Sequence, residues 1–343
     1  MLKIDRDVTT PLHLQLAQIL REDICSGRIR PGDKLMSESE MVKRYGIARL
    51  TVREALNHLV NEGLVEKQHG RGSFCKQAVV AKSIDVLLDM SESYFVPYYM
   101  QSISAVLEAN HANLIAGDTK NDNEEILRKL HMILKRGTDG VILQGCPKRN
   151  MDLTALSAVL DQFSRAKIPV MIIDYDYCVP EACCAVMDER MVGKLAAQYF
   201  ITNGHRNTAA VCIPGDGLSE ERFFGFQREI KQCIRIDVQA DLKELLVDAV
   251  QKGITGLFCY NDTVAKQCLD LLQDCGFSVP EDVSIISVDD TMLARFCNLT
   301  SVVHPKQLLG RYAAEEILRS IHPKGQVFEP VLAERTSVKK LKI

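Results

Sequence analysis

Two helical patterns near the amino terminus are separated by only two residues, and this spacing strongly restricts the possible folds. A capping box opens the first pattern, with Ser37 as the N-cap and Glu40 as the third helical residue, and Gly46 ends it. Residues 47–48 separate it from a second apolar periodicity over residues 52–60. Two helices joined by so tight a turn form a helix-turn-helix.

The residues around this pair of helices complete the pattern of a winged helix. A helical apolar stripe over residues 12–24 precedes the pair, and two strand-like segments, 64–68 and 73–75, follow it. The glycine-rich tip between those segments predicts a hairpin wing that exposes Arg71 for contact with a phosphate or a minor groove. We therefore expect residues 1–75 to fold as a winged helix-turn-helix.

The second helix carries polar residues in the part that enters a major groove. Arg49, Thr51 and Arg53 lie in its first turns, where the side chains of such a helix reach base edges and phosphates. Helix-turn-helix geometry is not exclusive to DNA binding, so a small helical domain that packs on a protein partner is the alternative.

Almost the whole of this first segment resembles the DNA-binding domain of the GntR family. The strings that carry the resemblance are Pro11-Leu12, Gly32-Asp33-Lys34-Leu35, Ser37-Glu38, Tyr45–Leu56, Glu62-Gly63-Leu64 and Gly70–Phe74. The resemblance implies that the recognition helix contacts operator DNA and that the wing assists it. The complete set of expected DNA-contacting residues is Ser37, Glu38, Arg49, Thr51, Arg53, His69, Gly70 and Arg71.

Two positions depart from the pattern of that family. Ser39 stands where the family often has a third basic residue after the Ser-Glu pair, so one DNA contact is expected to be missing. Ala48 stands at the usual hydroxyl N-cap of the recognition helix, which we expect to cost about 1 kcal/mol of helix stability.

After a short connector, residues 76–83, apolar strands alternate with helical segments. The strand-like segments are 84–89, 114–116, 140–143, 169–174, 209–213, 256–260 and 283–288. Strands that are buried on both faces and separated by helices form parallel α/β layers, which bind ligands at the carboxyl ends of their strands. We therefore expect residues 84–343 to form a doubly wound α/β domain with a ligand site.

Polar residues that suit a polyol lie at several of these strand ends. Arg222 lies beyond one strand, and Asn261 and Asp289 end two others; each of the three offers two directed hydrogen-bonding groups to adjacent hydroxyls. Aromatic residues after the first strand are suited to offer an apolar face to a sugar ring or, alternatively, to pack in the core. The expected ligand-contacting residues are Tyr94, Phe95, Arg222, Tyr260, Asn261 and Asp289.

Several of these strand-end residues also have a structural alternative. Arg222 is equally suited to a salt bridge. Asp262 is suited to cap a helix that begins at Val264, and Asp290 a helix that begins at Thr291, because short carboxylates often cap helices.

The second part of the chain resembles the sensor domain of the LacI/GalR family, which is akin to periplasmic sugar-binding proteins. The matching strings are Val186-Met187-Asp188, Gly193, Ala196–Phe200, Gly204-His205-Arg206, Glu221-Arg222, Gly225-Phe226, Tyr260-Asn261-Asp262, Gly276–Ile285, Asp289-Asp290, Leu299–Val302, Pro305 and Gly310. The resemblance implies a two-lobed periplasmic-binding-protein-like (type I) fold with crossovers near residues 187, 302 and 326. It also implies an effector in the cleft, with family roles on Arg222, Asn261 and Asp289.

A GntR-type head on a LacI-type sensor resembles the arrangement of the arabinose repressors, as do the strings Cys259–Asp262 and Val303–Lys306. The resemblance implies a repressor of carbohydrate-utilisation genes that responds to a small sugar, with L-arabinose as the candidate. It also implies a homodimer on double-stranded operator DNA, whose two recognition helices lie about one DNA turn (~34 Å) or a multiple apart.

Composition excludes several other classes of protein. The 42 Lys+Arg and 45 Asp+Glu residues give a net charge of −3, so the chain has no wholly basic coat for nucleic acid. No apolar run approaches the ~20 residues of a membrane span, and no signal peptide is recognisable, so we expect a cytoplasmic protein without a membrane partner. The 12 cysteines contain no C-x-x-C pair, so we expect reduced thiols and no metal site.

Two alternative functions are disfavoured by the motifs. An NAD-dependent oxidoreductase on a doubly wound sheet needs a G-x-G-x-x-G loop, and the nearest approach, Gly215-Asp216-Gly217, lacks the third glycine. A transport binding protein does not fit the missing export signal or the attached head. We therefore expect no catalytic residues and no cofactor.

Overall fold

The computed structural model describes residue 4 and residues 10–25, 28–68, 70–76, 81–90, 94–147, 151–239 and 241–341. The chain divides into two compact units, Met1–Ala81 and Lys82–Ile343. This division falls at the connector expected over residues 76–83, of which 77–80 lie outside the described residues.

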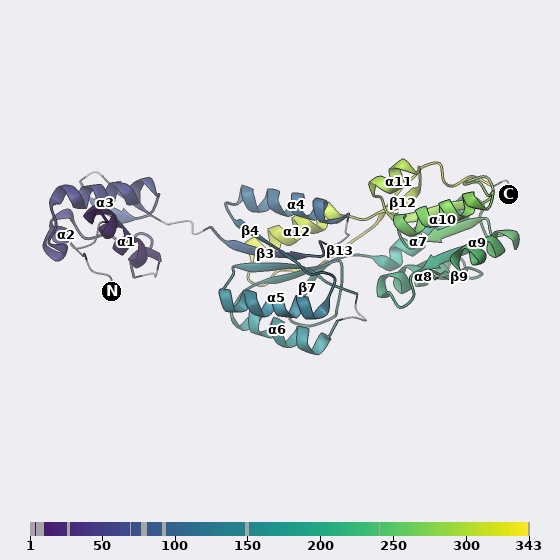
Figure 1. Cartoon of the computed structure of the whole chain (residues 1–343), viewed down its shortest axis with the longest axis horizontal. Helices are drawn as coiled ribbons and strands as arrows, with labels where there is room; N and C mark the ends of the chain where they lie inside the picture. Colours follow the sequence, from purple (N-terminus) through teal and green to yellow (C-terminus); the bar gives the residue numbers. More distant parts are fainter. Residues whose placement is uncertain are drawn as a thin grey trace. The chain divides into compact units, whose positions relative to one another are not determined.

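The first unit is a winged helix-turn-helix, as the sequence predicts. It contains α1 (Leu12–Cys25), α2 (Glu38–Tyr45), α3 (Arg49–Asn61), β1 (Val65–Gln68) and β2 (Gly72–Cys75) (Figure 1). The two strands are antiparallel, and the three helices enclose an apolar core that includes Leu20, Met41 and Leu56.

Local capping signals set the ends of the helices in this unit. Both hydrogen bonds of the predicted capping box at the start of α2 are present, Ser37 N–H to Glu40 Oε2 at 2.7 Å and Glu40 N–H to Ser37 Oγ at 3.3 Å. Gly46 ends α2 with a φ of 65°, a left-handed conformation that glycine adopts at little cost. Ala48 precedes α3 without a side-chain cap, as expected.

The second unit contains two six-stranded sheets, which we call lobe 1 and lobe 2. The sheet of lobe 1 has the order β13 (Gln326–Phe328), β7 (Cys183–Met187), β6 (Val170–Ile173), β5 (Gly140–Gln144), β3 (Ser83–Leu88) and β4 (Asn113–Asp118). The sheet of lobe 2 has the order β14 (Val331–Ala333), β12 (Thr300–Val303), β11 (Ser284–Asp289), β10 (Gly256–Cys259), β8 (Thr208–Cys212) and β9 (Ile234–Asp237). Apart from antiparallel β14, neighbouring strands in both sheets are parallel.

Helices cover both faces of each sheet, as in a doubly wound fold. In lobe 1, α4 (Val96–Ala109) and α12 (Lys306–Arg319) pack on one face, and α5 (Asn123–Arg136) and α6 (Leu153–Arg165) pack on the other (Figure 1). In lobe 2, α7 (Glu189–Thr202) and α8 (Gly217–Glu229) lie opposite α9 (Leu242–Gln251) and α10 (Asp262–Asp274). The short helix α11 (Met292–Phe296) follows β11.

The chain passes between the lobes three times. It crosses at residue 188 between β7 and α7, at residues 304–305 between β12 and α12, and at residues 329–330 between β13 and β14. The expected positions were near residues 187, 302 and 326. Because lobe 1 is completed by late segments of the chain, both lobes depend on the whole of the second unit.

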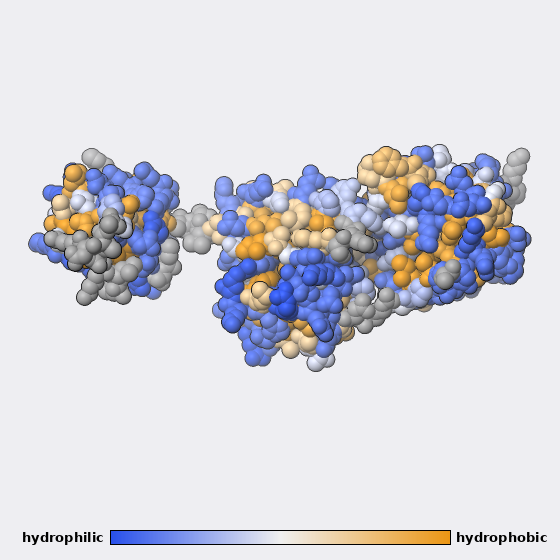
Figure 2. Space-filling view, viewed as in Figure 1, coloured by the Kyte–Doolittle hydropathy of each residue, from blue (hydrophilic) through white to orange (hydrophobic). Residues whose placement is uncertain are grey.

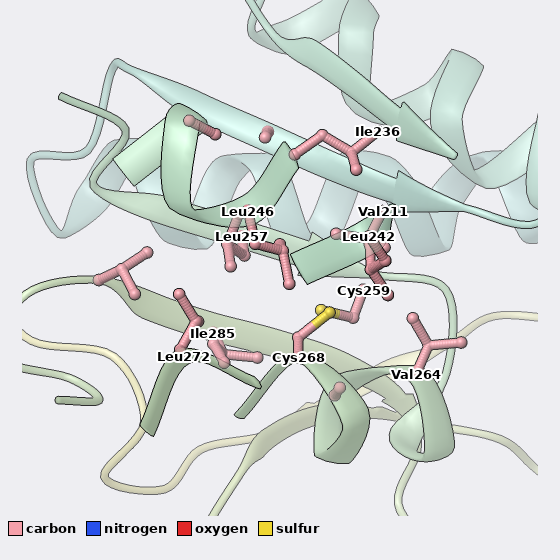
Figure 3. Close-up of a cluster of buried hydrophobic side chains, with 14 of the residues drawn as sticks. Val211, Ile236, Leu242, Leu246, Leu257, Cys259, Val264, Cys268, Leu272 and Ile285 are labelled. Carbon is pink, nitrogen blue, oxygen red and sulfur yellow. The ribbon is translucent and has the colours of Figure 1, made fainter. Parts of the chain in front are cut away.

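The face of the molecule that Figure 2 shows is largely polar, and the cores between sheets and helices are apolar. Figure 2 shows polar side chains over most of the visible face, with an apolar area over α11. Figure 3 shows the core between the sheet of lobe 2 and α9 and α10, in which Leu246, Leu257 and Ile285 pack together. Cys259 and Cys268 are buried in this core as free thiols, in the role of small apolar side chains.

Helices α7 and α8 touch at two glycines. A Cβ on Gly193 would lie 1.9 Å from the main-chain oxygen of Arg222, and a Cβ on Gly225 would lie 2.0 Å from that of Arg190. Real side chains do not approach so closely, and the blocking atoms belong to the rigid main chain. The backbones of α7 and α8 therefore meet only because both positions lack a side chain.

We expect Gly193→Ala to destabilise the second unit by about 1–3 kcal/mol or more, because the added methyl group forces α7 and α8 apart. The matched control is Gly217→Ala in the first turn of α8, where a Cβ meets no atom within 4 Å. Thermal and urea unfolding of the full chain measure both effects. Equal stability of the two variants would contradict this account of the helix contact.

Candidate functional site

The start of α3 presents two arginines beside one carboxylate. Arg49 Nε donates to Glu38 Oε2 at 3.0 Å, and Arg53 Nε donates to the same oxygen at 3.1 Å. The side chains of Arg49 and Arg53 are 63% and 57% exposed. Burial alone would raise the pKa of Glu38, but the hydrogen bonds from the two arginines outweigh it and lower this pKa. Glu38 therefore stays ionised and orients both guanidinium groups.

The other residues expected at this surface occupy the flanks of α2 and α3 and the wing. The side chain of Ser37 caps α2, and Thr51 is half-buried in the first turn of α3. Gly70 and Arg71 are exposed at the hairpin tip, where the Arg71 guanidinium lies 5.9 Å from the centre of the Phe74 ring. His69 lies outside the described residues.

One exposed residue at this surface was not selected from the sequence. Leu50 follows Arg49 in the first turn of α3 and is 67% exposed. Leu50 lies opposite the buried side of α3, which includes Val52 and Leu56. Helical periodicity predicts this exposed position, so the sequence alone could have identified it.

A cavity of about 260 Å³ lies between lobe 1 and lobe 2, at the carboxyl ends of their strands. All six residues that the sequence selected line it: Tyr94, Phe95, Arg222, Tyr260, Asn261 and Asp289. The structure therefore brings together residues that are separated by up to two hundred positions, since parallel strands in each lobe end at one edge.

Arg222 from α8 forms the wall of this cavity and is fixed by three contacts. Its Nε donates to Glu189 Oε2 at 2.5 Å, its Nη1 donates to the main-chain oxygen of Tyr260 at 2.6 Å, and its guanidinium lies 4.8 Å from the centre of the Tyr260 ring. Burial raises the pKa of Glu189 above its ordinary value, although the charge of Arg222 acts in the opposite direction. Arg222 thus forms the salt bridge that the sequence allowed as an alternative to ligand contact, and it also lines the cavity.

Asp289, the last residue of β11, is held from lobe 1 at two points. The Tyr94 hydroxyl donates to Asp289 Oδ2 at 3.3 Å, and Lys306 Nζ donates to the main-chain oxygen of Asp289 at 2.6 Å. Asp289 has a φ of 106°, a strained conformation for a residue with a side chain. Burial raises the pKa of its carboxyl group to about 7, against the opposing charge of Arg222.

Two of the capping alternatives were wrong. Asn261, not Asp262, caps α10, because Asn261 Oδ1 accepts from Val264 N–H at 2.9 Å. Asp262 instead accepts four hydrogen bonds, from Ser287 Oγ, Ser301 Oγ, Thr291 N–H and Thr291 Oγ1.

Asp290 is also not a helix cap. Thr291 occupies the N-cap position of α11, and Asp290 pairs with Arg335 at 2.5 Å and with Arg295 at 3.2 Å. Buried hydrogen-bond and ion-pair partners from distant strands and loops therefore override the local preference of Asp262 and Asp290 for a cap.

Further residues that line the cavity were missed. They are Asp89, Gln144, Asp174, Tyr175, Glu189, Leu218 and His304. Gln144 and Asp174 lie at the ends of β5 and β6, so the strand-end rule applied to lobe 2 would have found them in lobe 1. Gln144 Nε2 donates to Asp174 Oδ2 at 2.8 Å, the Tyr99 hydroxyl donates to Asp174 Oδ1, and burial raises the pKa of Asp174 to about 6.

A second cavity, of about 490 Å³, adjoins the first near the crossover between β7 and α7. The two cavities share Asp174, Tyr175, Glu189 and Leu218 as lining residues. The cleft between the lobes thus extends beyond the space that the predicted ligand-contacting residues enclose.

The described residues contain neither a cluster of metal-ligating side chains nor a membrane-spanning helix. No group of three or more His, Cys, Asp or Glu side chains in that part of the chain is arranged to hold a metal ion. Within the same ranges, every helix is too short or too polar to cross a membrane.

Two family models match separate parts of the chain. Residues 12–75 match the bacterial regulatory proteins of the gntR family, and residues 197–338 match a periplasmic binding protein-like domain. The first match coincides with the winged helix, and the second covers most of lobe 2 and the return to lobe 1.

Relatives and solved structures agree with these matches. The chain is 26% identical to the arabinose metabolism transcriptional repressor of Geobacillus stearothermophilus, over 98% of this chain and 100% of that protein. It is 30% identical to the HTH-type transcriptional repressor PurR of Vibrio parahaemolyticus, over 76% of this chain and 82% of that repressor. A LacI family transcriptional regulator from Enterococcus faecalis, solved with bound ribose, shares the fold of the second unit, with a TM-score of 0.65 and 23% identity over 76% of this chain and 100% of that chain. The chain belongs to the bacterial HTH-type transcriptional regulators and joins a gntR-family winged helix to a periplasmic-binding-protein-like domain.

Proposed function

We propose that this protein is a sequence-specific repressor of carbohydrate-utilisation genes and that a small sugar bound between lobe 1 and lobe 2 controls it. The observation that carries the proposal is the cavity between the lobes, lined by an arginine, an amide, several carboxylates and aromatic rings, in a chain that also has an exposed recognition helix. In this proposal residues 1–75 bind DNA, residues 76–83 connect, and residues 84–343 sense the effector.

The recognition helix supplies the specific contacts to operator DNA in this proposal. Arg49, Thr51 and Arg53 reach base edges and phosphates, and Glu38 sets the direction of the two guanidinium groups. Ser37, His69, Gly70 and Arg71 contact the phosphate backbone or the minor groove beside them. Binding then weakens as salt concentration rises, because each phosphate contact releases counterions.

The cavity supplies the effector site. Arg222 and Asn261 donate to hydroxyl groups, Asp289 accepts from them, and the rings of Tyr94, Phe95 and Tyr260 pack against the carbon atoms of the sugar. L-Arabinose is our candidate effector, because two relatives that match nearly the whole chain are arabinose metabolism transcriptional repressors.

We do not propose the oxidoreductase, because the sequence lacks the glycine-rich phosphate loop that NAD requires. Turnover of a sugar or hydroxy acid with NAD by the purified chain would reverse this choice.

We propose that the protein works as a homodimer in the cytoplasm and that α11 contributes to contact between the copies. Phe296 is 77% exposed, and Met292 on the same helix and Leu308 on α12 are also exposed, so that apolar surface gathers over α11 (Figure 2). We propose a second copy of the chain as the partner at this surface, because an operator with two half-sites binds a dimer.

We expect Arg53→Ala to weaken operator binding by about 1–3 kcal/mol, because a base or phosphate contact is lost, and to leave effector binding unchanged. Operator fragments come from in vitro selection with the full chain, and gel shifts measure their affinity. Arg128→Ala, on an exposed arginine of α5 in the second unit, is the matched control. Equal loss of DNA and effector binding in Arg53→Ala would count against the division of roles.

We expect Asp289→Asn to lower effector affinity roughly tenfold or more, because the amide puts a donor in place of one of the two carboxylate acceptor oxygens, while DNA affinity without effector stays unchanged. The effector is first identified by thermal shift with a panel of pentoses and hexoses. A ligand at 100 times its Kd stabilises the folded chain by about 2.7 kcal/mol. If no sugar raises the Tm of the wild-type chain, a sugar-controlled repressor is the wrong conclusion.

We expect Phe296→Ser to shift the chain from dimer to monomer in analytical ultracentrifugation, because a polar residue at an apolar contact weakens association. Phe224→Ser is the matched control, because Phe224 is an exposed aromatic residue of the same lobe that stacks with Arg190 and Arg228 of its own chain. A dimer that is equally stable in both variants removes α11 from the interface.

A further inference from the structure

The cavity between the lobes contains one guanidinium group, and that group is already paired. Among the described residues that line the cavity, Arg222 is the one arginine or lysine. Its partner Glu189 is the first residue of α7, and the side chains of the two are only 5% and 10% exposed. Both charges are therefore withdrawn from water and compensate each other directly.

The pairing changes what Arg222 is able to bind. Its Nε–H donates to Glu189 and one Nη1–H to the main-chain oxygen of Tyr260, so two of its five N–H groups are engaged. The remaining N–H groups still suit a neutral hydroxyl. A phosphate or carboxylate gains most from an arginine with an unopposed positive charge, and Glu189 opposes that charge and occupies the Nε–H.

The rest of the lining disfavours an anion as well. Asp89, Asp174 and Asp289 contribute further carboxyl groups to the same cavity. Burial raises the pKa of Asp174 to about 6 and that of Asp289 to about 7, so the repulsion of an anion by these two grows as the pH rises above those values. His304 adds no positive charge, because burial and the neighbouring cations Lys306 and Arg222 lower its pKa well below the ordinary value.

Two other cations near the cleft are also engaged: Arg190, which lines the adjoining cavity, pairs with Glu221, and Lys306 is bound to the main chain. Lys306 Nζ donates to the main-chain oxygen of Asp289 and lies 5.2 Å from the ring centres of both Phe95 and Tyr98. Lys306 lines a neighbouring cavity of about 430 Å³ together with Tyr98 and Arg295, and the two cavities share His304. An anion in the cavity between the lobes would thus lose its hydration beside carboxyl groups without gaining a free counter-charge.

We propose that Glu189 is a specificity-determining residue that keeps Arg222 from anions, so that the effector site accepts uncharged polyols and rejects sugar phosphates and sugar acids. This inference rests on the proposed function, because it concerns the effector of the same site. It goes further by naming the chemical class of the effector and the residue that selects it.

The first experiment compares matched ligands on the full wild-type chain. Each neutral sugar of a pentose and hexose panel is tested by thermal shift and calorimetry beside its terminal phosphate and its aldonic acid. We expect the neutral parent that binds best to do so at least tenfold more tightly than either anionic form, because repulsion against the wrong ligand contributes to specificity.

The second experiment changes the selecting residue. Glu189→Gln keeps the shape and removes the charge, so Arg222 gains an unopposed positive charge. We expect this variant to bind the phosphate or aldonate of the same sugar at least tenfold more tightly than the wild type does, with an affinity that falls as salt concentration rises. We also expect the anion to raise the Tm of the variant more than that of the wild type, because it replaces the lost counter-charge.

The control variant removes one negative charge from α8 without freeing Arg222 or another arginine that lines the cleft. Glu220→Gln fits, because exposed Glu220 pairs with Arg235 and neither residue lines either cavity of the cleft. We expect its preference for neutral sugars to match that of the wild type. Glu189→Asp keeps the charge and should still reject anions. This variant provides a second test of Glu189 if the Glu189→Gln chain fails to fold.

The outcomes separate the inference from the proposed function. If the wild-type chain binds a sugar phosphate or aldonate as tightly as the neutral parent, the inference is overturned and the sugar-controlled repressor stands. The inference also falls if Glu220→Gln gains anion affinity as much as Glu189→Gln does. If no sugar of either charge stabilises the wild type, the effector assignment in the proposed function fails, and the inference fails with it.

Discussion

The buried pair of Arg222 and Glu189 is the interaction on which the arrangement of lobe 2 around the cleft depends. Glu189 begins α7 directly after the first crossover, and Arg222 lies on α8, which touches α7 at Gly193 and Gly225. Removing one charge of such a pair leaves the other buried without compensation, at a typical cost of about 3–5 kcal/mol. The two side chains that form this wall of the cavity therefore lie on the same two helices that meet at the glycines. The packing of α7 on α8 determines where the site lies.

The sequence predicted the fold where the signals are local or periodic. The capping box at Ser37 and Glu40 and the left-handed Gly46 determine the ends of α2 through hydrogen bonds between close neighbours in the chain. Apolar strands separated by helices predicted parallel sheets, and all six selected residues line one cavity. Residues far apart in the sequence converge there because parallel strands share an edge, so the prediction needed no knowledge of side-chain contacts.

The sequence could not distinguish three similar carboxylates, because their roles depend on partners that are distant along the chain. Asp262 is enclosed by hydroxyl and amide donors from Ser287, Ser301 and Thr291, and Asp290 is neutralised by two arginines. Asp289, between them in sequence, lines the cavity instead. Glu189 escaped selection for the same reason, since its importance lies in its contact with Arg222, thirty-three positions later.

Asp289 also connects ligand binding to the relation between the lobes. It belongs to lobe 2, yet the Tyr94 hydroxyl and Lys306 Nζ reach it from lobe 1. A ligand whose hydroxyl group takes the place of the Tyr94 hydroxyl on Asp289 alters a contact between the lobes in the same event. The free energy of binding is then coupled to the equilibrium between lobe arrangements, which is the condition for an effector to change the behaviour of a distant surface.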